Sequence, residues 1–231
     1  MVQAEEPCRL VTLGAATVRA TTDEGIGLED GRTIRLAAVT VPNAADAALQ
    51  AGKEIMLKRA GAEETDRYGR LVAHIFVHEH GAERWFQADL LRAGVAHASA
   101  RIGEAACARV LFAAEQAARD AKLGLWADPY YVMNKAEDAA EILKQRGRFA
   151  LIEGKVLSVR ESGGTIYVNF GRRWSEDFSV TIAKRNERMF TAAGLEPKKL
   201  AGRRVRIRGW VEQRGGPWVD AARPEQIEVL Q

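Results

Sequence analysis

The stretch "DRYGRLVAHIFV", residues 66–77, decides how the first part of the chain folds. From position 71 onward two sets of residues alternate, with Leu71 and Ile75 on one face and His74 on the other. This period of two is expected of a strand. The sequence therefore predicts a strand from Leu71 to Val77, with Arg70 at its end.

The residues around this strand predict further short elements. Residues 9–39 predict three short strands with turns at Asp23–Gly25 and at "EDG", residues 29–31, because Asp and Gly tolerate tight hairpin angles. A short helix is expected after Pro42, and a second helix ends at Gly94. The longest helix is expected in residues 104–126, with one face made of Ala106, Val110, Ala113 or Ala114, Ala117 and Ala121.

The second half of the chain begins at Asp128-Pro129, a pair that breaks the preceding helix. We expect a domain at residues 1–127, a helical connector at residues 128–147 and a second domain at residues 148–231. Hairpin turns and one helix between the third and fourth strands of the last segment suit a small oligonucleotide/oligosaccharide-binding (OB) barrel. The expected fold class is mainly β with α (α+β).

The composition is that of a folded chain with unevenly distributed charge. Apolar residues make up 47% of the 231 residues, which is enough for a core. No stretch approaches the ~20 apolar residues of a membrane helix, so no membrane span is expected. The net charge is only +3, but residues 148–231 hold 16 Lys/Arg against 10 Asp/Glu. This basic segment suits either a polyanion partner or a solvated surface.

Four motifs occur in a fixed order along residues 30–126. They are "DGRTIRLAAVTVP", "DRYGRLVAHIFV", "FQADLLRAGVAHA" and "AARDAKLGLW". In this order they resemble the staphylococcal nuclease-like (thermonuclease) domains, and "DRYGRL" before a hydrophobic strand is the most specific of them. The resemblance covers roughly residues 10–127 and implies a five-stranded OB-like barrel with three helices. Residues 148–231 resemble the OB-like domain that is appended to such nucleases in some bacterial proteins.

Two arginines match positions that grip phosphate in this family. Arg35 opens the strand before Pro42, and Arg70 ends "DRYGR". A guanidinium offers a planar fork that binds phosphate through two hydrogen bonds, and preorganised cations stabilise the charge of a phosphodiester transition state. The resemblance therefore implies that Arg35 and Arg70 are the catalytic cations. Without it, both would be interpreted as surface arginines at strand ends.

The carboxylates of the family site do not match. The resemblance implies an aspartate before the proline of the first motif and a glutamate after it, where this chain has Thr40 and Asn43. Neither side chain carries a negative charge or acts as a base near neutral pH. A calcium ion prefers several carboxylate oxygens, so it would depend on Asp23, Glu24 and Asp46. Asp46 equally suits a plain helix first turn.

Arginine and tryptophan are interleaved in the basic segment. The candidate nucleic-acid-binding residues are Arg172, Arg173, Trp174, Arg206 and Arg208. Arginines beside aromatic rings on an OB barrel bind single-stranded nucleic acid, with bases stacked on the rings. Alternation in "VRIRGW" predicts that its arginines form an exposed basic face. The alternative for Trp210 and Trp218 is that they fill the barrel core.

Cys8 and Cys107 are the two cysteines. In the barrel that the resemblance implies, the long helix packs against the sheet, so a tail entering the first strand could pass beside it and form a disulfide. The alternative is two unpaired thiols in a cytoplasmic protein. The start "VQAEEP" resembles the first residues of a chain cleaved at a signal site. We therefore expect a periplasmic or secreted protein whose signal peptide is absent from this sequence.

Three functions stay open. The first is a nuclease-fold protein that binds nucleic acid or another phosphate polyanion through a degenerate metal and base site, with weak or absent hydrolysis. The second is an active calcium-dependent endonuclease on single-stranded DNA or RNA. The third is a protein-interaction module built on a dead nuclease fold. The losses at Thr40 and Asn43 favour the first, because losing a general base costs about 10²–10⁴-fold in rate.

Overall fold

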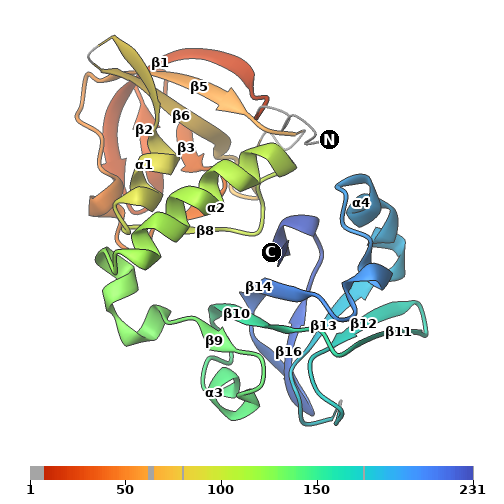
Figure 1. Ribbon diagram of the computed structural model, residues 1–231. Coiled ribbons are helices and arrows are strands. Elements are labelled where there is room, and N and C mark those ends of the chain that lie inside the picture. Colours follow the sequence, from red (N-terminus) through yellow and green to blue (C-terminus); the bar gives the residue numbers. More distant parts are fainter. Residues whose placement is uncertain (1–7, 62–64, 80, 174, 231) are drawn as a thin grey trace. The chain divides into compact units, whose positions relative to one another are not determined.

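The structure is a computed structural model that describes residues 8–61, 65–79, 81–173 and 175–230 (Figure 1). The fold is mainly β with some helices, as the sequence predicts. The chain divides into two compact units, Met1–Asp128 and Pro129–Gln231. Within the described residues, no helix has the length and apolar character needed to cross a membrane.

The described residues of the first unit form eight strands and two α-helices. The strands are β1 (Val11–Thr22), β2 (Gly25–Leu28), β3 (Thr33–Leu36), β4 (Val39–Thr40), β5 (Glu54–Arg59), β6 (Leu71–Glu79), β7 (Ala82–Trp85) and β8 (His97–Ala98). The helices are α1 (Phe86–Arg92) and α2 (Ala105–Asp120), with 3₁₀ turns η1 (Ala44–Ala47) and η2 (Gly124–Ala127). The short helix expected after Pro42 is therefore a single 3₁₀ turn.

Five of these strands close into a barrel. They pair in the order β3-β2-β1-β5-β6, and β6 pairs back with β3 in parallel. The long strand β1 serves two neighbours, since its first half pairs with β5 and its second half with β2, with register shifts that bend it. Ile34, Leu57 and Ile75 are buried inside the barrel. The strand predicted from Leu71 to Val77 is thus present as β6, with one face in this core.

A second core lies between the helices and β8. Leu91 of α1 and Leu111 of α2 are both fully buried in it, and Figure 1 shows the two helices next to the barrel strands. The predicted face of α2 is correct only in part, because Ala106 and Ala114 are buried while Val110 is exposed and Cys107 and Ala118 are buried instead. Gly94 (φ 72°) follows α1 at a point where a Cβ would lie 2.3 Å from the Leu123 carbonyl oxygen, so only glycine fits.

The predicted disulfide is present in this unit. Cys8 and Cys107 are bonded, with their Cα atoms 4.5 Å apart. The bond joins the chain just before β1 to the first turn of α2. It therefore closes a covalent loop around nearly the whole barrel.

The part of the second unit that the structure describes forms nine strands. These are β9 (Asn134–Lys135), β10 (Phe149–Lys155), β11 (Ser158–Ser162), β12 (Thr165–Asn169), β13 (Ser179–Ala183), β14 (Arg204–Trp210), β15 (Glu212–Arg214), β16 (Gly216–Asp220) and β17 (Ile227–Val229). Its α-helices are α3 (Ala139–Leu143) and α4 (Glu187–Ala192). Its 3₁₀ turns are η3 (Pro129–Tyr131), η4 (Lys184–Asn186), η5 (Pro197–Leu200) and η6 (Pro224–Gln226).

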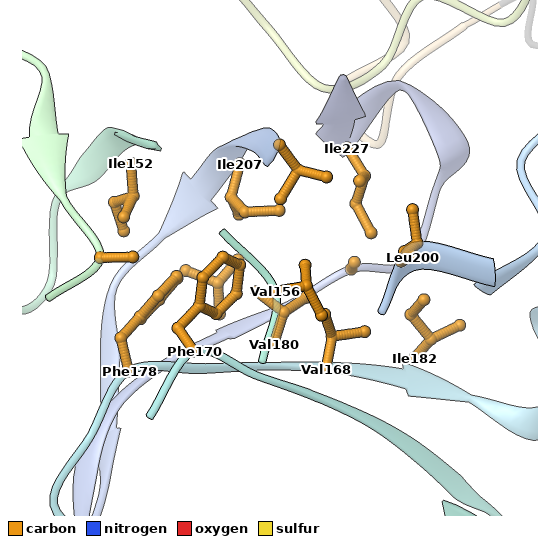
Figure 2. Packing of buried hydrophobic residues seen from close by; sticks show 14 of the residues in the cluster. Ile152, Val156, Val168, Phe170, Phe178, Val180, Ile182, Leu200, Ile207 and Ile227 are labelled. Carbon is orange, nitrogen blue, oxygen red and sulfur yellow. The ribbon is translucent and has the colours of Figure 1, made fainter. Parts of the chain in front are cut away.

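Two sheets of the second unit face one core. Their strand orders are β17-β14-β10-β9 and β11-β12-β13-β16-β15. Figure 2 shows side chains from both sheets, such as Ile207 and Val180, pointing into the shared interior. Among the described residues the two sheets share no strand pairing. The OB-type barrel expected for this unit therefore stays a prediction.

The prediction that the arginines of β14 form an exposed basic face is wrong. Arg206 is 8% exposed and Arg208 is fully buried. Arg206 lies directly opposite Glu153 on β10 and Glu228 on β17 in the strand register. Its guanidinium reaches Glu153 at 2.6 Å and Glu228 at 3.0 Å, and Arg208 approaches Glu228 at 3.8 Å. These carboxylates compensate the buried charge, so β14 is covered on both faces.

The two tryptophans of this region differ. Trp218 is 6% exposed and donates its indole N–H to Thr181 Oγ1 at 2.8 Å. Trp210 is 62% exposed, at the end of β14. The core prediction is therefore correct for Trp218 and wrong for Trp210.

Candidate functional site

Barrel closure places Arg35 and Arg70 together. The parallel pairing of β3 with β6 sets Ile34 opposite Leu71 and Arg35 opposite Val72. Arg70 immediately precedes β6, so the closure brings two arginines 35 positions apart in sequence to the same end of the two strands. The side chains of Arg35 and Arg70 are 29% and 25% exposed.

Asp66 organises the turn that leads to Arg70. Its Oδ1 accepts hydrogen bonds from the backbone N–H groups of Tyr68 (3.0 Å) and Arg70 (3.1 Å). Its backbone carbonyl accepts from Gly69 N–H at 2.9 Å, and Gly69 takes φ 75°. An aspartate that hydrogen-bonds the backbone two residues on, followed by a glycine with positive φ, forms a tight turn. The segment "DRYGR" is therefore a rigid loop.

The same carboxylate holds both arginine side chains. Arg70 Nε and Nη2 each lie 2.8 Å from Asp66 Oδ2, and Arg35 Nε lies 3.4 Å from that oxygen. Burial opposes the charge on Asp66, but hydrogen bonds from Arg70 and from the Arg70 and Tyr68 amides outweigh it and hold the pKa of Asp66 below its usual range. Arg70 Nη1 also donates to the Glu24 carbonyl at 2.6 Å. The arginines are thus preorganised around one anionic oxygen.

A cleft opens beside these arginines. It has a volume of about 250 Å³ and is lined by Arg35 and Arg70 together with Asp23, Glu24 and Thr40. Thr40 is exposed in β4, where it pairs with His97 of β8. The structure therefore brings four of the predicted site residues to one place with the neutral Thr40.

Asn43 and Asp46 lie outside the lining of this cleft. Asn43 is exposed and is the N-cap of η1, where its Oδ1 accepts from Ala45 N–H at 3.2 Å. Asp46 is exposed in the same turn. Asp46 is thus not among the lining residues of the cleft, and its part in a metal site stays a prediction. Its place in η1 is that of a first-turn acid, favoured by the backbone dipoles.

A calcium ion of the kind that the resemblance implies does not fit these residues. Calcium takes six to eight oxygen ligands with several carboxylates among them. Among the residues that the structure describes, Asp23 and Glu24 are the acids that line the cleft. Across the described parts of the chain, these two and Asp46 do not converge into a three-acid cluster. The two acids of the cleft therefore fall short of a calcium ligand set.

Tyr68 is a further residue at this site, to which the sequence motifs assign no role. It is 67% exposed at the tip of the "DRYGR" loop. The guanidinium carbons of Arg67 and Arg70 lie 4.7 Å and 5.3 Å from the centre of its ring. Cations over a ring face are attracted to it. The signal in the sequence is an aromatic residue between two arginines, directly before a glycine.

A comparison with protein-family models identifies the family of the segment that contains Arg35 and Arg70. Residues 33–128 match the family model described as staphylococcal nuclease homologue. This segment is a staphylococcal nuclease homologue domain. The nuclease domain includes Arg35, Thr40, Asn43 and Arg70, whereas Asp23 precedes the matched residues. No curated protein matches the chain.

The candidate residues of the second unit are scattered by the structure. Arg206 and Arg208 are buried in the ion-paired face of β14. Arg173 is exposed and forms an ion pair with Glu176 at 2.9 Å. Arg172 is exposed, and Trp174 lies outside the described residues. The structure therefore does not group the four described residues of this set into one basic face.

Proposed function

We propose that the nuclease domain binds nucleic acid, or another phosphate polyanion, through Arg35 and Arg70. The observation that carries this proposal is that both guanidiniums contact one carboxylate oxygen of Asp66 at the edge of an open cleft. A phosphate oxygen has the same charge and acceptor geometry as this carboxylate oxygen, and arginine forks suit both. Phosphate contacts also supply most of the affinity of proteins for nucleic acid.

We further propose that hydrolysis by this domain is weak or absent. Thr40 provides no negative charge in the cleft, and Asn43 lies outside it as a helix cap. Without a base, the attacking water is not deprotonated or positioned, which typically costs about 10²–10⁴-fold in rate. The site thus has the two cations Arg35 and Arg70, but at Thr40 and Asn43 it has no carboxylate that could act as the base.

The runner-up is a calcium-dependent endonuclease on single-stranded DNA or RNA. Asp23 and Glu24 favour it, because both line the cleft that holds the arginines. The third candidate is a protein-interaction module, in which acidic side chains of a partner would take the place of phosphate. A binding assay and a cleavage assay together separate these three functions.

A binding assay on the full chain tests the first proposal. The probe is a fluorescein-labelled single-stranded DNA, followed by anisotropy in the presence of EDTA. Arg35→Ala/Arg70→Ala should weaken binding and should reduce the steepness of the salt dependence by about 0.7 for each phosphate that is no longer bound. Arg92→Ala removes one exposed arginine on α1 and is the matched control, with binding near wild type. Equal affinity of wild type and the double variant would refute the proposal.

A cleavage assay tests the second proposal. Wild type is incubated with single-stranded DNA and RNA in calcium and, separately, in chelator. We expect no calcium-dependent cleavage above background. Calcium-dependent cleavage that disappears in Arg35→Ala and in Arg70→Ala would establish the runner-up. Absence of both binding and cleavage would leave the protein-interaction module.

We also propose that the protein is exported to the periplasm or secreted. The Cys8–Cys107 disulfide supports this location, because disulfides persist in oxidising compartments. Non-reducing electrophoresis of protein from the periplasm or the medium tests this location. Protein in that fraction should contain the Cys8–Cys107 disulfide.

A further inference from the structure

A separate pocket lies in the second unit, on β11 and β12 and the residues that follow β12. It has a volume of about 620 Å³. Its lining residues include Leu157, Ser158, Arg160, Tyr167, Asn169 and Arg172. The volume falls in the range of sites that take small organic groups. Of the residues proposed from sequence for this unit, only Arg172 belongs to the pocket.

The strand register builds the floor of this pocket. Tyr167 of β12 lies opposite Arg160 of β11, and Asn169 lies opposite Ser158. Asn169 Nδ2 donates to Ser158 Oγ at 3.4 Å, which ties the two strands together at the pocket. Ile166, next to Tyr167 on β12, is fully buried in the core, so Tyr167 faces away from it.

The tyrosine ring is open to a ligand. Tyr167 is 38% exposed, and within the described residues its ring contacts neither another ring nor a cation. Other rings on this protein are occupied: Arg148 covers Tyr130, and Arg214 covers Trp218. Tyr167 therefore presents a free aromatic face on a rigid strand.

The charge of the pocket is uncompensated. Arg160 and Arg172 are exposed, and in the described part of the chain neither forms an ion pair. No acidic side chain is among the described residues that line the pocket. The neighbouring Glu161 bonds to Lys184 at 2.8 Å, on the opposite face of β11. Two free guanidiniums and a free ring thus line the same pocket, with no carboxylate among its described lining residues.

We propose that this pocket, defined by Arg160, Tyr167, Asn169 and Arg172, is a second binding site for single-stranded nucleic acid. A ligand with planar rings and regularly spaced anionic groups matches a pocket lined by one ring and two cations, and stacking on the ring needs a base that is free of a duplex. Asn169 and Ser158 provide polar groups beside the ring. The inference shares its ligand class with the function proposed for the nuclease domain, but it rests on different residues.

Anisotropy with a fluorescein-labelled dT strand of about 12 nucleotides, in EDTA, tests the site on the full chain. Tyr167→Ala should weaken binding roughly five- to a hundredfold, and Tyr167→Phe should restore it, because the ring is kept. Arg160→Ala/Arg172→Ala should lower the salt slope by about 0.7 per arginine. Arg188→Ala removes an exposed arginine outside the pocket lining and should bind as wild type. Thermal unfolding checks that each variant is folded.

A second arm separates this site from the nuclease domain. The Arg35→Ala/Arg70→Ala variant should retain binding that still depends on Tyr167. If Tyr167→Ala binds as wild type while Arg35→Ala/Arg70→Ala loses binding, the second site is refuted and the proposed function stands. If Tyr167→Ala and Arg188→Ala weaken binding equally, the effect is not specific to the pocket and the second site is also refuted. If Tyr167→Ala weakens binding while Arg35→Ala/Arg70→Ala binds as wild type, the nuclease domain does not bind this ligand and the proposed function is refuted.

Discussion

Arg70 holds Asp66 through two donors, since its Nε and Nη2 each lie 2.8 Å from the same carboxylate oxygen. Arg35 reaches that oxygen from the neighbouring strand at 3.4 Å. Asp66 therefore fixes the guanidiniums in place. In the phosphate binding that we propose, it also occupies the position of a phosphate oxygen, so we expect it to compete with the ligand.

Asp66→Asn should separate these two roles. The amide keeps an oxygen for the turn amides but removes the negative charge between the arginines. We expect the free energy of unfolding to fall by about 1–3 kcal/mol, and binding of single-stranded DNA to become tighter with a steeper salt dependence. Denaturant unfolding and anisotropy measure the two effects. Weaker binding by a folded Asp66→Asn protein would contradict the competition.

Thr40→Asp/Asn43→Glu restores acids at the two neutral positions. If the missing acids are what limits hydrolysis, calcium-dependent cleavage of single-stranded DNA should rise by about 10²–10⁴-fold. Replacing the cap residue Asn43 should cost about 0.5–2 kcal/mol of stability. A gel assay with calcium and with chelator measures the gain. Thr40→Asn/Asn43→Gln changes the same positions without charge and should stay inactive.

His74 should make the first unit sensitive to acid. It is 1% exposed, lies edge-on to Trp85, and has no hydrogen-bond partner for either ring nitrogen among the described residues. Burial lowers the pKa of His74 from 6.5 to about 4. Because the folded pKa lies below the unfolded one, stability is full above pH 6.5 and falls as the pH drops towards 4.

Urea unfolding at pH 7 and pH 5 measures this effect. Between these values wild type should lose about 2 kcal/mol through His74. In His74→Leu, the free energy of unfolding should fall less between pH 7 and pH 5, by the amount that His74 contributes. His78→Leu is the matched control, because His78 is exposed on the same strand and should leave the loss unchanged. Identical pH dependence of wild type and His74→Leu would show that His74 does not titrate in this way.

Cys8→Ala/Cys107→Ala should destabilise the nuclease domain. The bond spans 99 positions of sequence, and closing a loop of this length stabilises by up to ~4.7 kcal/mol through the unfolded chain. Urea unfolding with and without reductant measures the change. Reductant should lower the stability of wild type and leave the double variant unaffected. A reductant effect of equal size on both proteins would have another cause.

Local patterns predict much of the nuclease domain and little of the second unit's surface. The alternation from Leu71 to Val77 and the arginine before it lie within one short segment, so the strand and its end could be read directly. The burial of Arg206 could not, because it depends on Glu153 and Glu228, which the strand register brings opposite it from 53 and 22 positions away. Partners on distant strands produce no pattern among neighbouring residues of the sequence.

The face of α2 could be predicted only in part, for a different reason. Alanine occurs on both sides of the helix, since Ala114 and Ala118 are buried while Ala113 and Ala117 are exposed, so alanine spacing alone does not identify the buried face. The pocket at Tyr167 has a further cause, because it forms only when the β11–β12 hairpin sets Arg160 opposite Tyr167 and the residues after β12 bring Arg172 to the same place.

The bond between Cys8 and Cys107 makes the barrel a covalent ring that contains Arg35, Asp66 and Arg70. A protease that cuts this ring once, for example after the exposed Arg67, opens the backbone without releasing a fragment. The nicked molecule keeps its full mass on a non-reducing gel and separates into two pieces only when a reductant is added. A single cleavage within the ring would thus leave both arginines in one molecule.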